Sequence, residues 1–116
     1  SLDIEEVHRR IARFLRIEPP AADRIMDAYR GAEPGASASD LLAAITTDFM
    51  YRRNTMQHAV LQSATARAAT YAYVFDWKAP AWDGLLRSPH LNEVPFVFGT
   101  TRAASGLVGT GPALEP

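Results

Sequence analysis

Three histidines are the residues of this sequence best suited to proton-transfer chemistry. His8 lies among arginines, and His58 has no histidine or carboxylate three or four residues away, so neither has the spacing of a metal pair on a helix. We expect His8 to be a solvated surface residue and His58 a packing or surface residue. His90 differs because it lies in a loop, directly follows Pro89, and has Glu93 three residues later. Since imidazole accepts and returns a proton near neutral pH, His90 is a candidate general base, with a purely structural loop histidine as the alternative.

Other catalytic and cofactor motifs are absent from the sequence. It contains no Gly-x-Ser-x-Gly nucleophile elbow, no P-loop and no glycine fingerprint of dinucleotide-binding proteins. The lack of cysteine excludes disulfides, iron–sulfur clusters, thiolate zinc sites and a cysteine nucleophile, and it leaves the cellular compartment undetermined. We therefore predict no organic cofactor and no metal.

Composition and charge are typical of a globular chain of about one domain. The 116 residues are 47% hydrophobic and 22% charged, and 12 basic against 13 acidic residues give a formal net charge of −1. This balance gives no reason to expect nucleic acid or an anionic membrane as a partner. No apolar run approaches the ~20 residues of a membrane helix, and residues 1–6 are acidic rather than signal-like.

Apolar spacing predicts four helices, at about residues 3–16, 21–30, 39–46 and 48–66. Ser37 or Ser39 is expected to cap the third helix, with Asp40 three residues after Ser37 in the position of a capping box. Asp48 is expected to cap the fourth helix, because it follows two β-branched threonines. The predicted buried stripe of this last helix consists of Phe49, Met56, Val60 and Ala64.

One strand is predicted at about residues 70–77, where aromatic residues alternate with other side chains. No second run of this quality occurs in the sequence, although a strand needs partners for its backbone groups. The partners would lie on another chain or in a larger protein, and the isolated chain is expected to self-associate. A loop at 78–93 carries His90, a short apolar helix-like run follows at 94–98, and a Gly- and Pro-rich tail at 99–116 is expected to be loosely ordered.

The order of residues from Tyr71 to Gly99 resembles the C-terminal part of the type B carboxylesterases, relatives of the cholinesterases. The segment Tyr71-Ala72-Tyr73-Val74-Phe75-Asp76-Trp77 is similar to their Tyr-x-Tyr-x-Phe strand, and His90-Leu91-Asn92-Glu93-Val94-Pro95-Phe96-Val97-Phe98-Gly99 to their His-x-x-Glu block. Upstream, Tyr29-Arg30 and Thr47-Asp48-Phe49 match helix ends of the family. The family usually has Gly-Ala-x where this chain has Arg87-Ser88-Pro89.

The resemblance implies an α/β fold, with residues 1–116 forming a single segment from the C-terminal portion of an α/β-hydrolase that is mostly helical. It implies that His90 is the general base of a Ser-His-Glu/Asp triad, with Glu93 anchoring the histidine loop and Asp48 as a supporting residue. The implied partners are a small ester substrate and the remainder of the esterase domain. Without a nucleophile, the chain alone is expected to be inactive. The alternative is a non-catalytic helical interaction module, or an adhesion-type homologue of the esterase fold.

Overall fold

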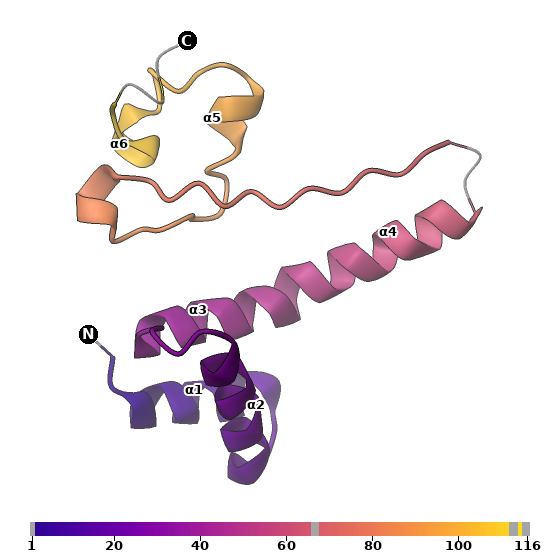
Figure 1. Ribbon diagram of the computed structural model, residues 1–116, viewed down its shortest axis with the longest axis vertical. Helices are drawn as coiled ribbons and strands as arrows, with labels where there is room; N and C mark the ends of the chain where they lie inside the picture. The colour runs from indigo at the N-terminus through magenta and orange to yellow at the C-terminus, as the bar shows by residue number, and fades with distance from the viewer. Residues whose placement is uncertain (1, 66–67, 112–113, 115–116) are drawn as a thin grey trace. The chain divides into compact units, whose positions relative to one another are not determined.

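The computed structural model describes residues 2–65, 68–111 and 114, which divide into two compact units, Ser1–Ala72 and Tyr73–Pro116. No described helix combines the length and the apolar character needed to cross a bilayer. Figure 1 labels the helices of both units.

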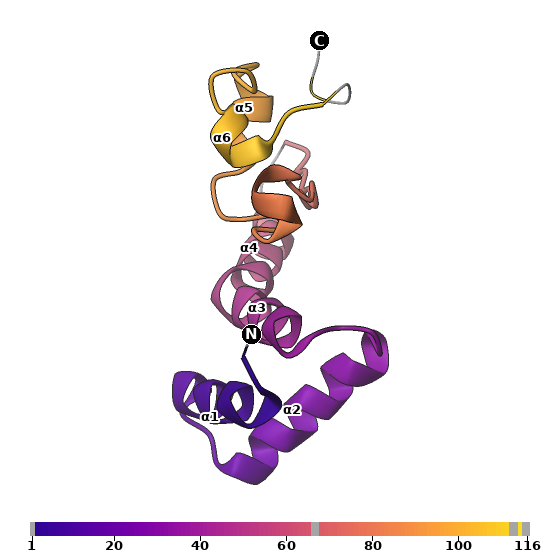
Figure 2. The ribbon, with the colours of Figure 1, turned by 90° about the vertical axis from the view of Figure 1, so that its left-hand side faces the viewer.

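Unit 1 is built from helices α1 (Ile4–Leu15), α2 (Pro19–Ala32), α3 (Ala38–Thr47) and α4 (Arg53–Thr65), with a π-helical turn, η1 (Asp48–Arg52), between the last two. Helices α1, α2 and α3 contact one another, and Figures 1 and 2 show α1 and α2 crossing beside α3.

Local sequence signals start and stop these helices. The carboxylate of Asp3 accepts the backbone N–H of Glu6 at 2.7 Å, which caps α1, and Arg16 closes the helix in the left-handed region with a φ of 54°. The two prolines form the first turn of α2, where a missing N–H costs no hydrogen bond. Ser37 and Asp40 form the capping box predicted for the third helix.

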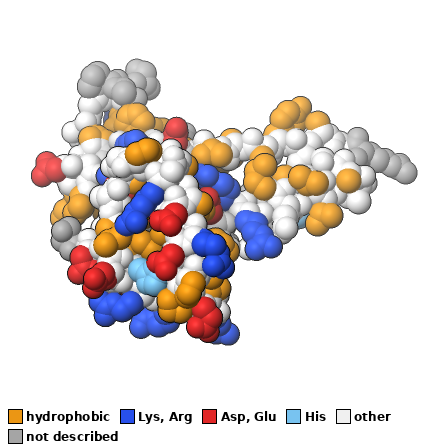
Figure 3. Space-filling view, turned by 60° about the horizontal axis from the view of Figure 1, so that its bottom comes forward, with side chains coloured by type: hydrophobic (Ala, Val, Ile, Leu, Met, Phe, Trp, Pro, Cys, Tyr) orange, Lys and Arg blue, Asp and Glu red, His pale blue; other side chains and the backbone are white. Residues whose placement is uncertain are grey.

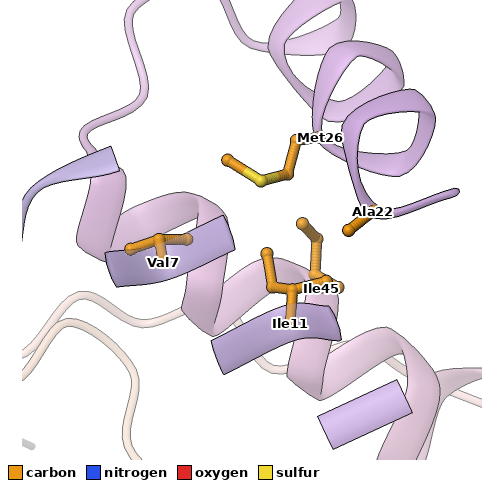
Figure 4. Close-up of a cluster of buried hydrophobic side chains, with 5 residues drawn as sticks. All are labelled: Val7, Ile11, Ala22, Met26 and Ile45. Atoms are coloured by element: carbon orange, nitrogen blue, oxygen red, sulfur yellow. The ribbon is translucent and has the colours of Figure 1, made fainter. Parts of the chain in front are cut away.

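The core of unit 1 is small and lies where the first three helices meet. Figure 4 shows its apolar side chains converging from all three. The buried cluster consists of Val7, Ile11, Ala22, Met26 and Ile45. Burying an aliphatic side chain of this size contributes about 1.5–3 kcal/mol relative to leaving it in water, so these few residues hold the three helices together.

The helix that was expected to restart at Asp48 does not restart. The backbone continues from α3 through η1 into α4, with the N–H of Arg53 bonded to the carbonyl of Asp48 five residues earlier. Asp48 therefore lies inside a helix instead of capping one.

The predicted buried stripe of the fourth helix is also wrong. No described residue of α4 is buried, and the side chains of Met56 and Val60 are 51% and 63% exposed. Helices α1 and α2 pack against α3, so the core of the unit ends before α4 begins.

The predicted α/β fold with a strand at 70–77 is wrong as well, because no strand occurs among the described residues, whose regular structure is entirely helical. Residues 69–80 form a long non-helical run in Figure 1. The physical reason is that a strand is defined by hydrogen bonds to a neighbouring strand, and no ladder of backbone hydrogen bonds joins residues 69–80 to another described segment.

Unit 2 holds the 3-10 helix η2 (Ala81–Gly84) and the short helices α5 (Val94–Val97) and α6 (Ser105–Val108). The region expected to be a loose tail contributes to this unit, because Val108 is fully buried and its carbonyl accepts the indole N–H of Trp77 at 3.4 Å. Ala79, Pro95 and Gly109 are also buried among the described residues of the unit.

Gly109 provides a sharp test of packing in unit 2. Its φ is +89°, and an added Cβ would lie 2.4 Å from Cγ of Pro80, whereas a Cβ on Gly106 meets nothing within 4 Å. We predict that Gly109→Ala lowers the free energy of unfolding by about 2–4 kcal/mol through left-handed strain and overpacking. Gly106→Ala, inside α6, should instead be neutral or stabilising by about 0.5–1 kcal/mol.

The measurement is urea unfolding followed by tryptophan fluorescence, since both tryptophans, Trp77 and Trp82, belong to unit 2. Effects of the same sign at Gly106 and Gly109 would contradict the close approach of Gly109 to Pro80.

Candidate functional site

His90 lies at an exposed turn directly before α5. The backbone N–H of Asn92 donates to the carbonyl of Pro89 at 3.1 Å, which puts His90 at the second and Leu91 at the third position of a four-residue turn. Leu91 has a φ of 72°, the left-handed conformation that a type II turn requires at its third position. The turn therefore presents the imidazole at the surface on a short, closed piece of backbone.

Glu93 follows the turn and begins α5. Its backbone carbonyl accepts the N–H groups of Phe96 and Val97, both at 3.0 Å, and its side chain is half-buried. His90 and Glu93 are thus held in one unit, three residues apart, with the second at the start of a helix.

Aromatic side chains brace this region from the preceding extended run. The ring of Phe96 lies 5.2 Å from that of Phe75 and 5.5 Å from that of Trp77, measured between centroids, with interplanar angles of 59° and 56°. Tilted pairs at this distance contribute about 0.5–1.5 kcal/mol beyond their area burial. Phe75 and Trp77, which the predicted alternation places on one face, therefore both pack on Phe96, although the strand itself is missing.

Two backbone-directed contacts close the loop between the extended run and His90. The N–H of Ala79 donates to the carbonyl of Arg87 at 2.8 Å, and Oγ of Ser88 donates to the carbonyl of Phe75 at 3.5 Å. The residues just before His90 are thereby held against the same run that carries the aromatic side chains.

Asn92 is a member of the site that sequence reasoning missed. It is fully buried, and both polar atoms of its side-chain amide have no hydrogen-bond partner among the described residues. An unsatisfied buried polar group costs about 1–3 kcal/mol. An asparagine in a turn is common, so no signal in the sequence distinguishes this one.

Asp48 lies in unit 1, whereas His90 and Glu93 lie in unit 2. Its carboxylate accepts the hydroxyl of Tyr29 at 2.7 Å through Oδ2 and pairs through Oδ1 with Nε of Arg52 at 3.2 Å. Both oxygens are therefore engaged, and Asp48 joins α2 to the π-helical turn.

The other two histidines have separate surroundings. Nε2 of His8 lies 3.0 Å from Oδ1 of Asp23 and 3.1 Å from the carbonyl of Pro19, so this half-buried side chain joins α1 to α2 rather than being simply solvated. His58 is exposed on α4, and the sequence predicts it to be a packing or surface residue.

His8 also lines a hollow on unit 1. Figure 3 shows acidic and basic side chains intermixed on one face of the surface. Nowhere in residues 2–65, 68–111 and 114 do three or more histidine, aspartate or glutamate side chains gather so that they could hold a metal ion.

Comparison with known proteins adds no family assignment: no protein-family model matches the chain, and no solved structure matches it. The likeness to the type B carboxylesterases therefore rests on the resemblance in sequence alone.

The strain at Leu91 can be measured against a matched leucine. Leu91 and Leu85 are both exposed, at 55% and 79%, but Leu85 has an ordinary φ of −61°. A left-handed conformation costs a residue with a Cβ about 1–2 kcal/mol, a cost that glycine avoids. We predict that Leu91→Gly is about 1–2 kcal/mol more stable than Leu85→Gly in urea unfolding. Equal stabilities would show that Leu91 is not held left-handed.

The contact between Tyr29 and Asp48 predicts a pH dependence. Burial, followed by the hydrogen bond to Asp48, raises the pKa of Tyr29 from about 10 to about 12. Because the folded state favours the neutral phenol, the stability that this preference contributes is present below pH 10 and is lost as the pH rises towards 12.

We predict that Tyr29→Phe is less stable than the wild type at neutral pH, by about 1 kcal/mol for the lost hydrogen bond, and that this difference shrinks between pH 10 and 12. Urea unfolding across that range checks it. Tyr71→Phe is the control, since Tyr71 is 91% exposed and its removal should leave the pH profile unchanged. A constant difference between wild type and Tyr29→Phe would contradict the raised pKa.

Proposed function

We propose that this chain supplies His90 as the general base of a Ser-His-Glu/Asp site that hydrolyses carboxylic esters, with the serine nucleophile coming from polypeptide outside this sequence. The proposal concerns the chemistry alone and does not include an α/β sheet. The substrate class, a small ester, follows from the resemblance to the carboxylesterases.

The observation that carries the proposal is the setting of His90. A general base must reach its substrate and also keep its direction, because a displacement of about 1 Å can cost about 10²-fold in rate. His90 is exposed, its turn is closed by a backbone hydrogen bond, and Phe96, six residues later, is packed on Phe75 and Trp77. An exposed imidazole on a braced turn is the arrangement that proton transfer with a bound ester needs.

A departure from the family motif is accommodated by the backbone. The carboxylesterases usually have glycine where this chain has Arg87. Here Arg87 has a φ of 55°, in the region that favours glycine. The chain thus keeps the backbone conformation that suits the family residue, which supports reading this segment as the equivalent loop.

His90→Ala tests the proposed chemistry in the protein expressed from its complete reading frame or together with the complementing polypeptide. If His90 is the base, turnover of a p-nitrophenyl ester should fall by ~10⁴-fold with little change in KM, as the loss of a triad member does elsewhere. Glu93→Gln should cost less, about 10²-fold, because it displaces the base without deleting it.

His58→Ala is the matched control, since His58 is exposed in unit 1 and lies outside the turn. Melting temperatures are measured on the same preparations, because a histidine that only packs a loop would lower the melting temperature and leave turnover per folded molecule intact. If well-folded His90→Ala retains more than a tenth of the wild-type activity, His90 is not the general base.

The exposed apolar side chains of helix α4 favour a second candidate function. Helix α4 exposes Met56, Val60 and Leu61, at 51%, 63% and 66%, and buries none of its described residues. Exposed apolar side chains that gather on one element mark interaction surfaces, which favours a non-catalytic helical interaction module. This second function predicts that His90→Ala changes nothing, whereas Leu61→Glu prevents complex formation with a partner.

A further inference from the structure

The extended run before His90 has one edge occupied and one edge open. The carbonyl of Phe75 and the N–H of Ala79 bond to Ser88 and Arg87. In an extended chain, the N–H and C=O of one residue point to the same edge, and those of the next residue point to the opposite edge. Residues 75 and 79 therefore mark the edge that faces residues 87 and 88.

The opposite edge carries the backbone groups of Ala72, Val74 and Asp76. Among the described residues, these groups have no hydrogen-bond partner. No proline interrupts residues 70–78, so every N–H in the run can donate. An unpaired extended edge of this kind is a template for a strand of another chain.

The side chains of the run alternate in the same way. Phe75 and Trp77 are half-buried against Phe96, while Tyr71 and Tyr73, which share their face, are 91% and 75% exposed. The aromatic face is therefore packed at one end and unpacked at the other. Aromatic side chains exposed to this degree are costly to leave in water and gain from a second aromatic surface.

We propose that the open edge of residues 70–78 pairs with the same edge of a second copy of this chain, antiparallel, with Val74 opposite Val74. Val74 then exchanges both backbone hydrogen bonds with its counterpart, and Ala72 does so with Asp76. On the aromatic face, Tyr71 lies opposite Trp77 and Tyr73 opposite Phe75. The exposed tyrosines of each copy thereby extend the packed aromatic face of the other.

The sequence around Val74 is what selects a second copy and an antiparallel direction. The aromatic residues at 71, 73, 75 and 77 are arranged symmetrically about residue 74, so the segment is complementary to itself. Parallel pairing in register would put Asp76 opposite Asp76 and Lys78 opposite Lys78, which is unfavourable. Antiparallel pairing puts Asp76 opposite Ala72 and Lys78 opposite Thr70, so no like charges meet.

The 116-residue chain itself is the material for the test, by sedimentation equilibrium over a concentration series. We expect a monomer–dimer equilibrium. Val74→Lys places two lysines opposite each other at the centre of the pair and should raise the dissociation constant at least tenfold. The matched control is Val74→Thr, which keeps a β-branched side chain and should change the dissociation constant less than threefold.

The register is tested at Ala72, an exposed residue that the proposal puts opposite Asp76 of the other copy. Ala72→Lys should lower the dissociation constant and Ala72→Asp should raise it, each by about 2- to 30-fold because the pair occurs twice. Circular dichroism verifies that the helices of every variant are intact. A monomer at all concentrations would overturn the proposal, and so would a dimer that Ala72→Lys and Ala72→Asp affect equally, since its interface would lie elsewhere.

Discussion

Every backbone N–H and C=O removed from water needs a hydrogen-bond partner, and the two units of this chain meet that requirement in different ways. The helices of unit 1 pair their own backbone groups, so the three that meet at Ile11 and Ile45 need only a small apolar core to hold them. Unit 2 has little helix, and its long extended run pairs on one edge with the loop before His90. The position of the candidate general base therefore depends on bonds between irregular segments, supported by aromatic packing around Phe96.

The properties of the candidate site that the sequence could predict are local ones. His90 and Glu93 are three residues apart, and any turn followed by a helix keeps them in one region. Asp48 was grouped with them only by resemblance, and in the structure it belongs to unit 1, where Tyr29 and Arg52 engage its carboxylate. The burial of Asn92 and the left-handed backbone of Leu91 depend on tertiary packing, which residue types and spacing do not encode.

The predictions of the fold also succeeded where they depend on local interactions and failed where they depend on tertiary contacts. Ser37 and Asp40 form the expected capping box because the bonds involved span three residues, and the bounds predicted for the first three helices lie within two residues of those observed. The strand at 70–77 was predicted from alternation, which indicates which side chains share a face but not whether a neighbouring strand exists. The apolar spacing of Met56 and Val60 predicted a buried stripe. Periodicity shows which residues share a helix face, but it does not show whether another element covers that face.

The π-helical turn at Asp48–Arg52 determines the direction in which the side chains of α4 point around the helix axis. Successive residues of an α-helix are about 100° apart around the axis, and a π turn holds one residue more than an α turn. The 13 residues of α4 are therefore rotated by about 100° relative to a helix that continued α3 without the turn. A single inserted or deleted residue in this short segment decides which side chains of α4 share a face with Leu41 and Ile45. A change in the length of the turn can thus change the surface that α4 presents without altering any residue of the core.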